Sequence, residues 1–140
     1  MTHAVIFDLD GTLLNTLGDL TAAVNHGLAA QGLPAHTEAE VRTYVGDGVK
    51  ELIARACPSD ATDETRAAVL AAYLPYYAAH NADLTVPYDG VMDLLTTLRD
   101  AGVRCAAVTW GFQDRDRLAA QQPAALVDTA AALQAVLLRE

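Results

Sequence analysis

Residues 4–14 read AVIFDLDGTLL, and this stretch decides the fold. The apolar run at 4–7 is short and rich in β-forming residues, which predicts a fully buried strand of a parallel sheet. Open α/β sheets place their functional sites just beyond the carboxyl ends of their strands. We therefore expect Asp8 and Asp10 to lie at such an end, where residues 11–12 turn the chain away from the sheet.

Asp8 and Asp10 form a pair of acids at a spacing that favours chemistry over packing. In extended backbone, residues i and i+2 point to the same side, so their carboxylates repel unless they share a proton or a cation. Carboxylate oxygens suit Mg²⁺, and a carboxylate can also act as a nucleophile. Gly11 lets backbone N–H groups approach an anion, and Thr12 adds a hydroxyl. The alternative is a turn after a strand, with both acids in solvent.

The composition limits the class of protein. The chain has 140 residues, is 52% hydrophobic and carries a net charge of −9. This is enough for a core, either as one domain or as a small core with an inserted cap. The negative charge argues against nucleic acid or an anionic membrane as a partner, and an anionic substrate would need a metal or backbone N–H groups.

The termini and the cysteines suggest the compartment. The first residues of the sequence show neither a basic region nor a long apolar stretch, so neither a signal peptide nor a membrane helix is predicted. We therefore expect a cytoplasmic protein. Cys57 and Cys105 have no metal-site or disulfide-framework spacing, and the apolar run around Cys105 predicts a buried thiol.

An all-helical block follows the first strand. Apolar spacing, caps and breakers predict that its helices lie at about 16–31, 37–46, 49–57 and 62–80. Pro75 should kink or split the last of them. After this block we expect a helix at about 91–102 and a strand at about 103–108. A short helix at about 114–121, a strand at about 124–127 and a helix from 129 onward should follow. The predicted domains are therefore a discontinuous α/β core, residues 1–15 and 84–140, and a helical insert, residues 16–83.

The motif at 7–13, FDLDGTL, resembles the first motif of the haloacid dehalogenase-like hydrolase superfamily, and the chain looks most like its phosphoglycolate phosphatase group. The resemblance implies a Rossmann-like core of parallel strands flanked by helices, with the helical insert as a cap. It also implies a Mg²⁺-dependent phosphatase. Asp8 would attack phosphorus, Asp10 would serve as acid and base, and Asp8 with the Asp10 carbonyl would hold the ion.

The same resemblance assigns substrate-binding residues. Thr12 and Thr109 fall at positions that hold phosphoryl oxygens, together with the backbone at Gly11. The loop of Gly46, Asp47 and Gly48 looks like the cap loop that reaches the substrate, and Lys50, the only lysine, lies beside it. A solvated residue at a helix start is the alternative for Lys50. The implied partner is a small phosphomonoester acid such as 2-phosphoglycolate.

The chain departs from the family pattern after Thr109. The family also uses a Lys or Arg on a later helix and an acidic loop after a further strand, and neither has a clear counterpart here. Residues 101–108 resemble two separate segments of the family whose sequences are similar to each other. This suggests an internal deletion that joined the two segments. The alternative function is thus a shortened, catalytically weak or inactive relative. A sheet that has lost central strands exposes edges, which favours a homodimer.

Overall fold

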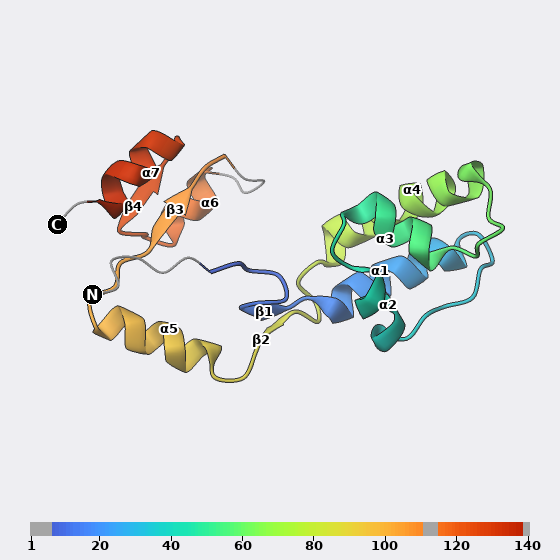
Figure 1. Cartoon of the computed structure of the whole chain (residues 1–140), viewed down its shortest axis with the longest axis horizontal. Helices are drawn as coiled ribbons and strands as arrows, with labels where there is room; N and C mark the ends of the chain where they lie inside the picture. Colours follow the sequence, from blue (N-terminus) through green and yellow to red (C-terminus); the bar gives the residue numbers. More distant parts are fainter. Residues whose placement is uncertain (1–6, 111–114, 139–140) are drawn as a thin grey trace. The chain divides into compact units, whose positions relative to one another are not determined.

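The computed structural model describes residues 7–110 and 115–138. The chain divides into two compact units, which are described here one at a time. The first is continuous, Asp8–Tyr88, and the second combines Met1–Phe7 with Asp89–Glu140. Figure 1 shows their helices and strands.

The unit of Asp8–Tyr88 is built on four helices, which carry the principal hydrophobic core (Figure 1). The helices are α1 (Leu17–Ala29), α2 (Glu38–Tyr44), α3 (Val49–Ala56) and α4 (Asp63–His80). Their most extensive contact joins α1 to α4. The helix at α4 runs through Pro75 without being split, contrary to one of the two outcomes expected from the sequence. The core consists of Ala23, Val24, Leu28, Val41, Leu52, Ile53, Ala56, Cys57, Val69 and Tyr73.

The chain enters and leaves this unit along one short antiparallel ribbon. Strand β1 (Leu14–Asn15) pairs with β2 (Val86–Pro87), and Leu14 lies opposite Pro87. The buried carboxylate of Asp19, at 2% exposure, accepts hydrogen bonds from the Leu84 N–H at 2.9 Å and the Thr85 hydroxyl at 2.6 Å. Asp19 therefore ties the first turn of α1 to the segment that leads back out of the helices.

Replacing Asp19 by Ala should destabilise this unit by about 2–3 kcal/mol, because two partly buried donors would lose an ionised acceptor. Thr85→Val is the graded control, since it removes only one of the two bonds and should cost about 1 kcal/mol. Urea unfolding of the three proteins measures the difference. Equal stability of Asp19→Ala and the wild type would contradict the tethering role.

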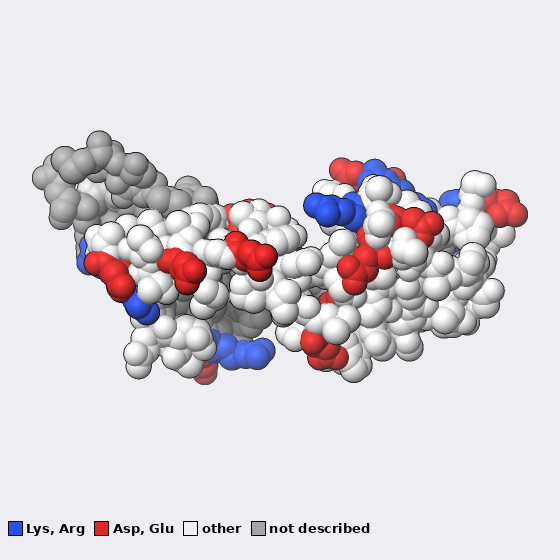
Figure 2. Space-filling view, turned by 90° about the horizontal axis from the view of Figure 1, so that it is seen from below, with Lys and Arg blue, Asp and Glu red and all other residues white. Residues whose placement is uncertain are grey.

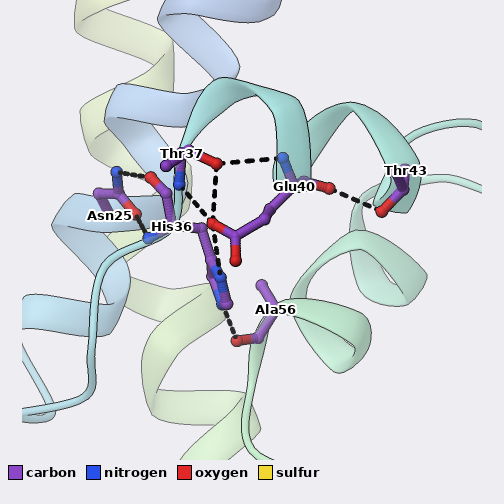
Figure 3. Close-up of polar contacts among 6 residues, drawn as sticks. All are labelled: Asn25, His36, Thr37, Glu40, Thr43 and Ala56. Carbon is purple, nitrogen blue, oxygen red and sulfur yellow. Dashed lines mark hydrogen bonds and ion pairs between the residues drawn. The ribbon is translucent and has the colours of Figure 1, made fainter.

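His36 links three of the helices (Figure 3). Its backbone exchanges two hydrogen bonds with the side-chain amide of Asn25 on α1, at 2.8 and 2.9 Å. Its ring Nε2 donates to the carbonyl of Ala56, the last residue of α3, at 2.8 Å. Just beyond His36, the predicted capping box is confirmed, with Thr37 and Glu40 bonding each other's backbone N–H at the start of α2. One loop residue thus fixes where α2 begins relative to α1 and α3.

The capping box predicts a specific acid sensitivity. Hydrogen bonds from the Thr37 backbone and hydroxyl, opposed in part by desolvation and helped by His36, hold the pKa of Glu40 below its ordinary value. A lowered folded-state pKa adds stability that is present above the unfolded pKa, about 4.3, and is lost as the pH falls through the folded value. Urea unfolding between pH 5 and pH 3 should therefore show a shallower loss for Glu40→Gln than for the wild type. Parallel curves would rule out this contribution of Glu40.

The second unit contains a short parallel sheet. Strand β3 (Ala106–Val108) pairs in parallel with β4 (Ala125–Val127), in a register that joins Ala106 to Ala125 and Val108 to Val127. The connection runs through α6 (Arg115–Ala120), and α7 (Ala130–Leu137) contacts both strands. The helix α5 (Val91–Asp100) precedes β3 and has no buried residue.

Several predictions for this unit are wrong in detail. Strand β3 begins at Ala106 rather than residue 103, and Cys105 is exposed rather than buried. Ala4–Ile6 lie outside the described residues, whereas Phe7, at 37% exposure, is neither in a strand nor buried. The common reason is that β3 has only β4 as a hydrogen-bonded neighbour among the residues described, so an apolar run alone does not give a fully buried strand.

Candidate active site

The loop that carries the two acids is a tight backbone turn. The Leu9 carbonyl accepts hydrogen bonds from the N–H groups of Thr12, Leu13 and Leu14, at 3.3, 2.9 and 2.9 Å. The Gly11 N–H donates to the Leu14 carbonyl at 2.8 Å. Gly11 has a φ of +74°, a conformation that glycine adopts without steric cost. This glycine therefore lets the chain turn directly after Asp10 and enter β1.

Asp8 and Asp10 are both exposed, at the start of this turn. The Thr12 hydroxyl donates to a carboxylate oxygen of Asp8 at 3.5 Å, a long bond that leaves the Asp8 carboxylate open to a ligand. No hydrogen bond in residues 7–110 and 115–138 uses the Asp10 backbone carbonyl, so it too is open. The two acids thus present accessible oxygen donors two residues apart.

A pocket of about 550 Å³ opens beside Asp10 and Gly11 within the unit of Asp8–Tyr88. Its walls come from the start of α1, the end of α2, the loop at Gly46 and Gly48, and the aromatic side of α4. This volume is typical of sites for small molecules. The pocket therefore joins part of the acidic loop to part of the predicted cap loop.

Tyrosines line the α4 side of the pocket. Tyr73 and Tyr77 stack with ring centroids 5.5 Å apart. Burial raises the pKa of the Tyr77 phenol, and the negative charges of Asp10 and Asp19 raise it further. The Tyr77 phenol is protonated at neutral pH, as a phenol of ordinary pKa also is, so its hydroxyl can donate a hydrogen bond from the wall of the pocket.

The cap-loop residues divide into two groups. Gly46 and Gly48 line the pocket, whereas Asp47 binds the Arg55 guanidinium at 2.5 Å. Arg55 also pairs with Glu51 at 3.2 Å and donates to the Tyr44 carbonyl at 3.2 Å. Arg55 therefore braces the loop. The i to i+4 spacing of Glu51 and Arg55 could have suggested only their own ion pair, because the contacts with Asp47 and Tyr44 have no such local signal.

Lys50 is exposed in the first turn of α3 and does not line the pocket. Its ammonium has no hydrogen bond or ion pair with any residue that the structure describes. Lys50 therefore lies at the surface near a helix start, as in the alternative given for it above. Gly46 and Gly48, in contrast, line the cavity.

Thr109 lies in the other unit, directly after β3. Its N–H donates to the Val127 carbonyl at 3.0 Å, and its hydroxyl donates to the Asp128 carboxylate at 2.6 Å. Arg115 forms an ion pair with the same carboxylate. The Thr109 hydrogen bond, followed by the Arg115 contacts and opposed in part by desolvation, lowers the pKa of Asp128. Sequence reasoning missed Asp128 as the partner of Thr109, since only the parallel pairing of β3 with β4 brings these two residues together.

The oxygen donors of the Asp8–Asp10 loop are of the kind that bind a divalent metal ion. Mg²⁺ prefers oxygen ligands and commonly binds through one or two carboxylates, completing its shell with water and substrate phosphate. The Asp8 carboxylate and the Asp10 carbonyl fit that requirement. A larger protein cage is not seen, because no three His, Cys, Asp or Glu side chains within the described residues could hold a metal ion together.

Comparison with known proteins now decides the family. Residues 5–120 match the family described as haloacid dehalogenase-like hydrolase. The chain belongs to the haloacid dehalogenase-like hydrolase family. The predicted fold class, an α/β core with an inserted helical block, is thereby confirmed, and the Asp8–Asp10 loop falls within the matched residues.

Individual relatives point to phosphatases within this family. Phosphoglycolate phosphatase 1 of Pseudomonas aeruginosa is 41% identical over 115 residues, which cover 78% of this chain and 42% of that protein. The N-acetylmuramic acid 6-phosphate phosphatase of the same organism is 37% identical over 106 residues, covering 76% and 47% of the two chains. This member of the family therefore spans about half the length of the curated relatives that it matches.

A solved structure extends the likeness to three dimensions. The crystal structure of a predicted phosphoglycolate phosphatase from Haemophilus somnus superimposes with a TM-score of 0.68 at 27% identity, covering 91% of this chain and 63% of the other. No helix in the described part of this chain is long and apolar enough to cross a membrane.

Proposed function

We propose that this chain is a phosphomonoester hydrolase that works through an aspartyl-phosphate on Asp8. The observation that carries the proposal is the exposed Asp8–Asp10 pair on a tight turn, with Asp10 and Gly11 lining a pocket of small-molecule size. The family to which the chain belongs, whose phosphatases it resembles, supports the same chemistry.

The reaction has two balanced steps. An Asp8 carboxylate oxygen attacks phosphorus, the bond from phosphorus to the substrate oxygen breaks, and protonated Asp10 gives its proton to the leaving alkoxide. Asp10, now a carboxylate, takes a proton from water as that water attacks the phosphorus of the aspartyl-phosphate. Inorganic phosphate leaves, and Asp8 returns as a carboxylate.

Mg²⁺ is the proposed cofactor, held by the Asp8 carboxylate and the Asp10 carbonyl. When bound, the ion would supply charge neutralisation for the phosphoryl group. Of the residues expected to hold the phosphoryl oxygens, the Thr12 hydroxyl is the one proposed here, because the Gly11 N–H already donates to the Leu14 carbonyl and the Thr109 hydroxyl to Asp128. The helical block 16–83 would act as the cap, with Gly46 and Gly48 facing the substrate.

The proposed substrate is a small phosphomonoester that also carries a carboxylic acid. The names of two relatives specify phosphoglycolate and N-acetylmuramic acid 6-phosphate, and both compounds combine a phosphate ester with a carboxylate. A pocket of about 550 Å³ is large enough for either kind of molecule.

A second candidate is a weak or inactive relative that binds phosphate or Mg²⁺ without turnover. It is favoured by the sequence, which has no lysine after Lys50 to stabilise the charge on a transferring phosphoryl group. Losing one such group typically reduces the rate by about 10²–10³.

Phosphate release from 2-phosphoglycolate, with Mg²⁺ and with excess EDTA, separates the two candidates. The purified chain is first checked for a folded monomer or dimer by size-exclusion chromatography and circular dichroism. Turnover that needs Mg²⁺ supports the hydrolase. A folded sample that releases no phosphate supports the inactive relative.

A further inference from the structure

The pocket beside Asp10 contains a single basic side chain among its described walls, Arg42 in the last turn of α2. The acids that line it are Asp10 and Glu38. On the face drawn in Figure 2, Lys and Arg side chains lie apart from one another and form no continuous basic surface among the described residues. Among the described residues that line this pocket, Arg42 is therefore the one source of positive side-chain charge for an anion that enters it.

Arg42 has no partner among the described residues, unlike the other two arginines of the unit of Asp8–Tyr88. Arg55 is held by Asp47 and Glu51, and Arg66 by Asp63, whereas the Arg42 guanidinium has no hydrogen bond or ion pair with any residue within 7–110 and 115–138. Its five N–H donors in a planar fork match the two oxygens of a carboxylate.

Glu38 lies one helical turn before Arg42, yet it forms no ion pair with Arg42 in the described structure. A Cβ built on Gly18 would lie 3.7 Å from the Glu38 Oε1, so this carboxylate is directed toward α1. Gly46 and Gly48 contribute backbone without side-chain bulk to the same wall of the pocket. The end of α2 therefore presents an unpaired guanidinium, that of Arg42, beside a loop whose glycines leave space for a ligand.

We infer that Arg42 is a specificity-determining residue that binds the carboxylate of the substrate while the phosphoryl group lies at the Asp8–Asp10 loop. The inference rests on the proposed function for the position of the phosphoryl group. It adds that Arg42 selects the phosphomonoester acid proposed above over a phosphomonoester without a carboxylate.

Binding, rather than turnover, tests this inference. 2-Phosphoglycolate and ethyl phosphate differ only in a carboxylate that replaces a methyl group, so the ratio of their dissociation constants reports recognition of the carboxylate. With excess EDTA, so that neither ligand is turned over, calorimetry on the full chain should show 2-phosphoglycolate binding at least about tenfold more tightly, as expected for charge-assisted hydrogen bonds. Arg42→Ala should abolish that ratio and leave the affinity for ethyl phosphate unchanged.

Two further variants sharpen the test. Arg42→Lys keeps the charge at the end of α2 but loses the fork, so it should retain only part of the preference. Arg99→Ala removes an exposed arginine of α5, paired with its neighbour Asp100, and should keep the full ratio. A wild type without preference, a wild type that binds neither ligand, or a preference that survives Arg42→Ala would each overturn the inference. A preference without any phosphate release would support Arg42 and count against the hydrolase.

Discussion

Asp8→Asn should eliminate phosphate release, with a loss on the order of 10³-fold or more, because an amide cannot serve as the nucleophile that accepts the phosphoryl group. The change is nearly isosteric. Asp8 is exposed and its one side-chain hydrogen bond in the described structure is the long contact with Thr12, so the variant should fold as the wild type does.

Two comparisons make the result specific. Asp60→Asn changes an exposed acid in the loop before α4, outside the pocket, and should leave the rate as it was. Asp10→Asn should slow turnover by about 10²–10⁴, the usual contribution of a general acid or base. A purified Asp8→Asn protein with the wild-type rate would mean that Asp8 is not the nucleophile or that the activity comes from a contaminant.

The sequence predicted the helical unit well because its signals are local. The Thr37–Glu40 capping box marks the start of α2 within four residues of chain, and the Thr62 hydroxyl caps α4 by accepting from the Thr65 N–H. Apolar spacing likewise identified the helices whose buried faces meet in the core. Such features depend on neighbours one turn away, so one sequence is enough to read them.

The parts that failed depend on residues far apart in the chain. Cys105 was expected to be buried because its neighbours are apolar, but burial of a strand requires partners on both sides and both faces. The tether from Asp19 to Leu84 and Thr85 spans more than sixty residues and has no local sequence signal. Arg42 escaped notice for the same reason, since only the folded helices show which cation lines the pocket.

The candidate site was predictable at its first motif and less so elsewhere. Two acids two residues apart, followed by Gly-Thr, carry their chemistry in the spacing itself, so Asp8 and Asp10 could be named from the sequence. Asp47 shows the limit, because a loop acid that looks available in the sequence is held by Arg55 in the fold. Which groups are open to a ligand depends on ion pairs that only three-dimensional contacts decide.

Gly27 is a position where one added methyl group should destabilise the helical unit. It lies inside α1 at the contact with α4, and a Cβ there would meet the Val69 carbonyl oxygen at 2.7 Å and a Val69 methyl group at 3.1 Å. Within a helix, Ala is intrinsically favoured over Gly by about 1 kcal/mol. Gly27→Ala therefore sets a local gain against a clash with backbone.

The cost of the clash should exceed the gain in helix propensity, because a backbone carbonyl inside a helix cannot move aside as the tip of a side chain can. We expect a net loss of about 1–3 kcal/mol, the usual range for overpacking a core, and a fall in melting temperature of several degrees. Separation of α1 from α4 would also disturb the pocket, since both helices contribute to its walls.

Gly32→Ala is the matched control. Gly32 follows α1 with a φ of +66°, and a Cβ there would meet no atom within 4 Å. Its replacement should cost about 1 kcal/mol through backbone strain alone. Thermal and urea unfolding of both variants separate the two causes: a Gly27→Ala protein as stable as the wild type would mean that α1 and α4 do not approach as closely as described, whereas a loss larger than that of Gly32→Ala would place the helix contact at the centre of this unit's stability.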